Sequence, residues 1–132
     1  MDPATPRSRV AMSPFTLYTY ANCDACRRAV KWLRARGLDF VEHPIRETPP
    51  TLVELRTMLA AQTGELRRLF NTAGRDYREQ QLGAKLPALT EDAALGLLAA
   101  NGNLVKRPFL LGPGVALVGF DEAKWTEAGL KS

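Results

Sequence analysis

The sequence predicts a single α/β domain, in which a mixed four-stranded sheet is interrupted by a helical insertion. Three observations lead to this prediction: a strand, helix, strand pattern near the N-terminus, a hairpin signal near the C-terminus, and helical patterns between them. Parallel strands joined by a helix and antiparallel strands joined by a tight turn combine into a mixed sheet. We therefore expect the order β-α-β, helices, β-β, α over residues 14–132, with the insertion at about residues 49–101.

The composition fits one compact domain. The chain has 132 residues, 45% of them hydrophobic and 24% charged, which is enough to bury a single core. Its formal net charge of +4 favours acidic partners in general but selects no ligand. We expect residues 1–13 to be a disordered extension, because they carry prolines and arginines and few hydrophobic residues.

Localisation and assembly are also predicted from the pattern of apolar residues. No apolar run is long enough to span a bilayer, and the first residues lack the apolar stretch of a secretory signal. We therefore expect a cytoplasmic protein that makes no membrane contact. Nothing in the sequence argues for an obligate dimer, so a monomer is expected.

The first half of the sheet is predicted from β propensity and helical periodicity. Phe15–Tyr20 is rich in aromatic and β-branched residues and is expected to form a strand. The helix that follows has an apolar stripe of Cys26, Ala29, Val30 and Leu33. Gly37 is typical of a residue that ends a helix, and Leu38–Ile45 is the second strand, limited to a sheet edge or a strand end by Pro44. The loop after the first strand then lies where α/β proteins build their sites.

The middle of the chain is predicted to be helical. Thr51 and Glu54 form the capping box that begins a helix. The apolar stripe of this helix consists of Leu52, Leu55, Met58 and Leu59. A short helix over Glu65–Phe70, a polar stretch over Arg75–Gln81 and a helix over Glu91–Ala100 follow.

The end of the chain predicts two more strands and a last helix. The apolar runs Phe109–Leu111 and Val115–Val118 are separated by Gly112-Pro113-Gly114, which indicates an antiparallel hairpin. Asp121 is then placed to cap a final helix that ends at about Ala128.

The two cysteines carry the clearest chemical signal. Cys23 and Cys26 are so close in the chain that the pair is better suited to react than to brace a fold. Cys23 stands at the start of the predicted helix, where backbone N–H groups and the helix dipole stabilise a thiolate. Cys26 lies one turn later and is placed to attack a mixed disulfide or sulfenic acid on Cys23. The alternative for Cys26 is packing within the apolar stripe.

No metal site or bound cofactor is predicted. A structural zinc ion needs four ligands, and the chain offers two cysteines and the single His43. His43 lies in the predicted second strand, where a packing or surface role is the simpler interpretation.

Arg107 and Pro108 directly precede the hairpin. Arg107 is placed to contact an anion or to stabilise the thiolate, and the alternative is a solvated surface arginine. A proline before a strand, in a fold of this order, is typical of the cis-proline that faces a reactive thiol. A single X-Pro bond is nevertheless usually trans.

Four segments together resemble the successive motifs of the ArsC family. They are Tyr20-Ala21-Asn22-Cys23 with Cys26, residues 69–74, residues 104–111 and Val118-Gly119-Phe120. The resemblance runs from about Phe15 to Trp125. That family includes arsenate reductases, the Spx-type transcription regulators and the YffB-like proteins. The resemblance implies a thioredoxin-like core with a helical insertion, a cis Pro108 and an Arg107 that faces Cys23.

The resemblance also implies a chemistry. In ArsC-type reductases the cysteine that matches Cys23 attacks arsenate, arginines hold the oxyanion, and glutathione with glutaredoxin, or thioredoxin, returns the thiol. This implies a thiol-dependent oxidoreductase in which Cys23 attacks arsenate or a related thiol-reactive substrate, such as another small oxyanion or a glutathione-type compound. Asn22, Arg107 and Pro108 are then expected to bind the substrate, and glutathione or Cys26 to resolve the intermediate.

The arginine set departs from the family pattern. The segment Gly112–Phe120 has no arginine where arsenate reductases supply one, and Ala73 stands where the YffB-like motif commonly has arginine. The arginines that are candidates to replace them are Arg46, Arg67, Arg68 and Arg75. The alternative function is an Spx-like regulator, in which Cys23 and Cys26 form a redox switch and the functional surface binds RNA polymerase.

Overall fold

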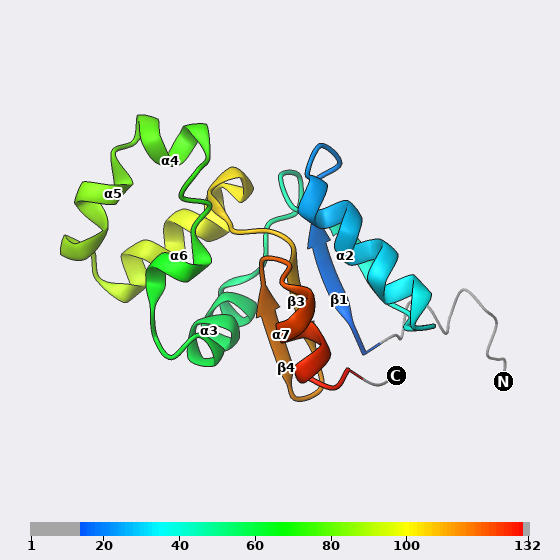
Figure 1. Ribbon diagram of the computed structural model, residues 1–132. Coiled ribbons are helices and arrows are strands. Elements are labelled where there is room, and N and C mark those ends of the chain that lie inside the picture. The colour runs from blue at the N-terminus through cyan, green and yellow to red at the C-terminus, as the bar shows by residue number, and fades with distance from the viewer. Residues whose placement is uncertain (1–13, 131–132) are drawn as a thin grey trace, which may run out of the picture.

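The core of the protein is a mixed sheet with the strand order β2-β1-β3-β4 (Figure 1). The computed structural model describes residues 14–130, so the extension predicted at residues 1–13 lies outside the described residues. The strands are β1 (Thr16–Thr19), β2 (Val41–Pro44), β3 (Phe109–Gly112) and β4 (Val115–Val118). β1 pairs in parallel with β2 and antiparallel with β3, and β3 pairs antiparallel with β4. The prediction of a mixed four-stranded sheet is confirmed.

The helices form two groups. α2 (Asp24–Ala35) and α7 (Glu122–Glu127) lie together in front of the sheet in Figure 1. The segment between β2 and β3 forms the insertion, which contains α3 (Leu52–Ala61), η1 (Leu66–Leu69), α4 (Arg75–Glu79), α5 (Leu82–Lys85), η2 (Leu86–Ala88), α6 (Glu91–Ala100) and η3 (Gly102–Leu104). Over residues 14–130, no helix has both the length and the apolar character needed to cross a membrane.

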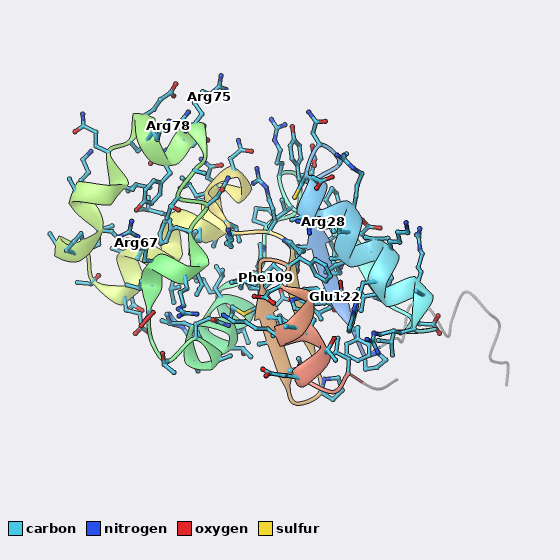
Figure 2. The ribbon with its side chains drawn as sticks, viewed as in Figure 1. Arg28, Arg67, Arg75, Arg78, Phe109 and Glu122 are labelled. Carbon is cyan, nitrogen blue, oxygen red and sulfur yellow. The ribbon has the colours of Figure 1, made fainter. Side chains whose placement is uncertain are left out.

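The two faces of the sheet bury separate hydrophobic cores, because successive side chains of a strand point to opposite faces. Leu17 and Leu110 belong to the core that α2 and α7 cover. Tyr18 and Phe109 belong to the core that the insertion covers, and Figure 2 labels Phe109 between the sheet and the insertion. The loops at the carboxyl ends of β1 and β2 therefore lie where the sheet meets the insertion.

α2 begins and ends where the sequence predicts. Its N-cap is Cys23, and its last turn is closed by Gly37, whose φ of 70° suits glycine better than other residues. The N–H groups of Gly37 and Leu38 donate to the carbonyls of Arg34 and Leu33 at 3.0 and 3.1 Å. These bonds turn the chain towards β2, which lies at the sheet edge, as Pro44 predicted. The strand spans only Val41–Pro44 of the expected Leu38–Ile45.

The insertion departs from the sequence prediction at several places. α5, η2 and η3 have no counterpart in it, and the short helix expected over Glu65–Phe70 is the 3-10 helix η1. The capping box of α3 is present in both directions, but Leu52 is 44% exposed and does not belong to the buried stripe, because it occupies the first turn of the helix. The stretch Arg75–Gln81, predicted only as polar, contains α4. α4 is held by Tyr77, which is buried with its ring centroid 6.1 Å from that of Phe70.

Candidate functional site

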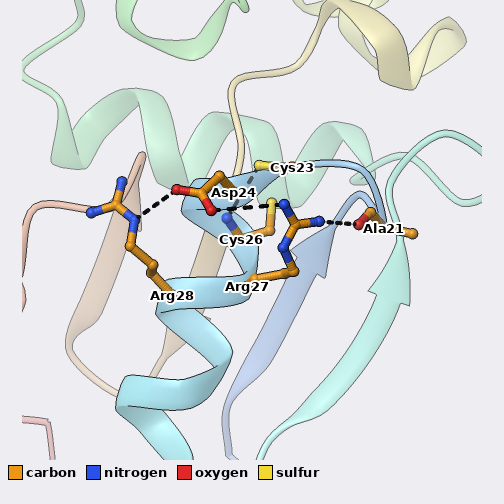
Figure 3. A network of polar contacts seen from close by, with 6 residues as sticks. All are labelled: Ala21, Cys23, Asp24, Cys26, Arg27 and Arg28. Atoms are coloured by element: carbon orange, nitrogen blue, oxygen red, sulfur yellow. Dashed lines mark hydrogen bonds and ion pairs between the residues drawn. The ribbon is translucent and has the colours of Figure 1, made fainter.

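Cys23 caps the N-terminus of α2 with its own sulfur (Figure 3). Its Sγ accepts a hydrogen bond from the backbone N–H of Cys26 at 3.1 Å. The backbone N–H of Cys23 donates to the carbonyl of Tyr20 at 3.1 Å, which closes the turn after β1. The residue is partly exposed. A backbone donor and the positive end of the helix dipole both favour negative charge on this atom.

Cys26 lies in the same turn but in a different environment. It is 2% exposed and faces the core. Burial raises its pKa to about 12 from the ordinary 9.0, and its hydrogen bond with Cys23 acts in the same direction. A backbone hydrogen bond with Tyr20 and, to a smaller extent, the positive charge of Arg107 oppose this rise in the pKa of Cys26. Cys26 is therefore a neutral thiol at ordinary pH and must lose a proton before it can attack a disulfide.

The arginines on the first turns of α2 are already engaged. Asp24 pairs with Arg28 at 3.3 Å and with Arg27 at 3.7 Å, and Arg27 also donates to the carbonyl of Ala21 at 2.9 Å (Figure 3). These side chains lie at the surface, where such pairs stabilise the fold little but compensate each other's charge. Further positive charge near the end of β1 comes from other elements.

That charge gathers around Tyr20, at the end of β1. The guanidinium carbons of Arg107 and Arg46 lie 5.0 and 5.2 Å from the centre of the Tyr20 ring. Arg46 also donates to the Tyr20 hydroxyl at 3.0 Å, and Arg107 donates to the carbonyl of Asn103 at 3.5 Å. Cation–π contacts of this kind hold both arginines near one aromatic ring. The peptide bond between Arg107 and Pro108 is cis, as the family resemblance implies.

A cleft of about 300 Å³ opens beside this group, between the core and the insertion. Its lining residues are Tyr20, Arg46, Asn71, Gly74, Arg75, Asp76, Asn103 and Arg107. Asp76 accepts hydrogen bonds from the side-chain amides of Asn101 and Asn103 at 3.0 and 3.3 Å. The Asn101 bond is the main cause that lowers the pKa of Asp76, so this carboxylate is ionised. Among these lining residues, three guanidinium groups face one carboxylate, and the cleft favours an anion.

The structure brings some of the predicted site residues together and separates others. Asn22 is exposed in the turn before Cys23, and its role stays a prediction. Arg46 and Arg75 join Arg107 at one cleft. Arg67 and Arg68 instead line a second cleft of about 400 Å³ that includes residues of β4 and α7. Tyr20 was predicted only as a strand residue and part of a family motif, whereas the structure has it lining the cleft with Arg46 and Arg107.

Two other features complete the surroundings of the thiols. A groove of about 700 Å³ between α2 and the edge strand β2 is lined by Cys26, together with Arg27, Lys31 and Glu42. The ring of His43 packs at 5.1 Å from that of Tyr18, which agrees with a packing role. Within residues 14–130, no three His, Cys, Asp or Glu side chains gather closely enough to hold a metal ion.

Comparisons with known proteins agree on one family. The sequence model of the ArsC family matches residues 18–128. The uncharacterized protein YusI of Bacillus subtilis is 40% identical over 85% of this chain and 95% of its own length. The global transcriptional regulator Spx 1 of Lactococcus lactis is 30% identical over 80% of this chain and 81% of its own. The crystal structure of "a possible arsenate reductase" from Streptococcus mutans matches with a TM-score of 0.80 and 35% identity, over 87% of this chain and 98% of that one.

Proposed function

The chain belongs to the ArsC family, and from this membership we propose that it is a thiol-dependent oxidoreductase whose nucleophile is Cys23. The observation that carries the proposal is the position of the Cys23 sulfur. It is partly exposed at the N-terminus of α2 and accepts the N–H of Cys26 at 3.1 Å. The same bond would stabilise a thiolate waiting for substrate, or a thiolate leaving a mixed disulfide.

The proposed reaction has two steps. The thiolate of Cys23 first forms a bond to an electrophilic atom of the substrate, arsenic in arsenate or sulfur in a disulfide, and displaces a leaving group that takes a proton from solvent. A second thiol, from glutathione or from Cys26, then attacks the Cys23 sulfur. The bonding electron pair leaves with the substrate atom, which is thereby reduced, and a disulfide forms.

Three neighbouring residues are proposed to bind the substrate. Arg107 is proposed to supply positive charge, since its guanidinium lies 5.0 Å from the ring of Tyr20, whose carbonyl accepts the N–H of Cys23. The cis Pro108 is buried and its carbonyl accepts the N–H of Gly119 at 2.8 Å, which fixes the backbone that presents Arg107. Asn22 stands exposed beside Cys23 and is placed to reach a bound ligand. The reductant is proposed to be glutathione with glutaredoxin, or thioredoxin, in the cytoplasm.

Arsenate reduction by the purified protein tests the proposal, with glutathione plus glutaredoxin and separately with thioredoxin. Cys23→Ser should abolish turnover, and Arg107→Ala should lower it about a hundredfold, the usual cost of a lost charge-stabilising donor. Arg67→Ala removes an arginine from the other cleft and is the matched control. Cys26→Ser shows which thiol resolves the intermediate.

Absence of turnover with either reductant removes arsenate as the substrate. The thiol chemistry itself is contradicted if Cys23 also fails to form a mixed disulfide with small organic disulfides.

A second candidate function is an Spx-like redox switch, favoured by the 30% identity to Spx 1 of Lactococcus lactis. In this function the Cys23–Cys26 pair would open or close a disulfide, and a surface of the protein would bind RNA polymerase. A pull-down with the α subunit of RNA polymerase, repeated after oxidation, tests it. The regulator is favoured if the amount of α subunit retained changes with oxidation in the wild type but not in Cys23→Ser. No retention of the α subunit in either redox state argues against it.

A further inference from the structure

The cleft beside Tyr20 can bind a charged group of the substrate that is separate from the atom that reacts with Cys23. We infer that Arg46, Arg75 and Arg107 bind the carboxylate of a small organic disulfide whose sulfur reacts with Cys23. This inference rests on the proposed function, because it needs Cys23 as the nucleophile. It adds a substrate class, namely low-molecular-weight disulfides that carry a carboxylate.

The position of the cleft relative to the sulfur atoms carries the argument. Among the described residues that line it, neither Cys23 nor Cys26 is present. An anion seated in this cleft is therefore not at bonding distance from the nucleophile. Tyr20 connects the two places, because its ring lines the cleft while its carbonyl accepts the N–H of Cys23 at 3.1 Å. A ligand must accordingly hold its charge some bonds away from its reactive atom.

The cleft favours an anion because three guanidinium groups line it against the single carboxylate of Asp76, on which the charges of Arg75 and Arg46 act. The Asp76 carboxylate is already bonded to the amides of Asn101 and Asn103. Arg75 approaches Glu79 only at 3.9 Å, and both side chains are mostly exposed. Arg46 and Arg107 are held by neutral groups, the Tyr20 ring and hydroxyl and the Asn103 carbonyl. A guanidinium bound to neutral partners retains its charge for a carboxylate, which fits its fork of donors.

The size of the cleft agrees with this use. A volume of about 300 Å³ accommodates a carboxylate with a few carbon atoms. Asn71 and Asn103 also line the cleft, and the Asn103 amide donates to Asp76 at 3.3 Å. The chemical step is ordinary exchange: the Cys23 thiolate attacks one sulfur of the disulfide, the S–S bond breaks, and the leaving thiolate takes a proton from water. A second thiol, such as glutathione, then reduces the mixed disulfide.

A matched pair of disulfides tests the inference. Dithiodipropionate carries carboxylates, and hydroxyethyl disulfide is neutral and of similar length. The rate at which each disulfide forms an adduct on Cys23 is measured by quenched mass spectrometry. This measurement uses the Cys26→Ser variant, so that the adduct accumulates. In the wild-type protein, the release of thiol from each disulfide is followed instead. We expect dithiodipropionate to react about tenfold faster, the factor that one charge-assisted hydrogen bond gives.

Variants show whether the cleft causes that preference. Arg46→Gln and Arg75→Gln should each reduce the preference for dithiodipropionate to about twofold or less, since each removes one guanidinium. Arg67→Gln removes the same charge from η1 in another part of the insertion and should keep the preference (Figure 2).

Three results would overturn the inference. The first is that the two disulfides react at equal rates. The second is that the preference for dithiodipropionate survives in both cleft variants. The third is that arsenate is reduced and that its turnover depends on Arg75 as steeply as on Arg107. In each of these cases Cys23 still reacts, so the proposed function stands. Failure of Cys23 to form an adduct with either disulfide would instead contradict the proposed function, and the inference with it.

Discussion

Cys23 and Cys26 show how the same residue type acquires different properties within one helical turn. The first sulfur is partly exposed and serves as the helix cap, whereas the second is 2% exposed and faces the core. The sequence left both packing and resolution open for Cys26. The burial of Cys26 favours its packing role, whereas the resolving role stays a prediction, because the bond to the Cys23 sulfur comes from the backbone N–H of Cys26 and not from its thiol.

The ionisation of Cys26 predicts a dependence of stability on pH. Its pKa is about 12 in the folded chain against an ordinary 9.0, so between these values the folded state keeps a proton that the unfolded state loses. The stabilisation is therefore complete below pH 9 and is lost as the pH rises towards 12. Urea unfolding of the reduced protein should show a loss near pH 10 of about 1.4 kcal/mol relative to Cys26→Ala. Parallel pH curves for the two proteins would contradict this, and Cys23→Ser controls for the other thiol.

The arginines mark the limit of sequence-based prediction at the residue scale. Arg107 stood out in the sequence because it belongs to a local motif next to Pro108, and its role at the site stays a prediction. The other candidate arginines looked equivalent in the sequence, namely Arg46, Arg67, Arg68 and Arg75. Arg46 follows β2 and Arg75 begins α4, and only the packing of the insertion against the sheet brings them to one cleft. That packing depends on contacts between segments far apart in the chain, which no local pattern records.

At the scale of elements, α3 depends on its capping box. Thr51 accepts the N–H of Glu54 at 3.2 Å, and Glu54 returns a bond to the Thr51 N–H at 2.9 Å. The same oxygen of Glu54 accepts the hydroxyl of Tyr18 at 2.6 Å and so ties the helix to β1. Tyr18 is buried, and its pKa is raised by that burial and by Glu54.

We expect Thr51→Ala to lower the free energy of unfolding by about 1 kcal/mol, because the helix loses one cap and Glu54 loses part of its anchoring. Thr57→Ala is the matched control: its hydroxyl donates to the carbonyl of Val53 on the exposed face of the same helix. That change should stay within about 0.5 kcal/mol. Equal effects of the two substitutions, measured by urea unfolding, would argue against the capping role.

Two glycines of neighbouring elements predict opposite effects. A Cβ on Gly102 would overlap the carbonyl oxygen of Ile45, where η3 packs against the end of β2. Gly96 lies in α6, and a Cβ there meets nothing within 4 Å. Gly102→Ala should therefore cost at least about 2 kcal/mol, whereas Gly96→Ala should stabilise the fold by about 0.5–1 kcal/mol. Thermal unfolding of both variants checks the signs, and a stable Gly102→Ala would contradict the close packing.

The sequence predicted elements best where their signals are local. The α2 cap, Gly37 and the hairpin of β3 and β4 were all found from short patterns. α4 was missed because its five residues contain one buried side chain, Tyr77, and no period to detect. It exists because Tyr77 packs on Phe70 and Asp76 binds Asn101 and Asn103, which are contacts made only in the folded chain.

At the scale of the molecule, positive charge should govern how fast charged substrates arrive. The chain carries a formal net charge of +4, and the cleft beside Tyr20 concentrates part of it. Salt shortens the range of such attraction to roughly 10 Å at about 0.1 M and less above it. The reaction rate with dithiodipropionate should therefore fall several-fold between about 20 mM and about 500 mM salt, while the rate with hydroxyethyl disulfide changes little. If the two reaction rates depended equally on salt, the positive charge of the protein would not be attracting the carboxylates of the substrate.

The edges of the sheet bear on how the protein behaves when concentrated. An exposed edge strand offers free backbone groups on which a neighbouring molecule can build a further strand. Here both edge strands are only four residues long, and β2 carries an exposed Glu42 and ends at Pro44, which has no N–H to donate. Such edges give little template for fibre growth, so preparations at high concentration should remain clear and monodisperse.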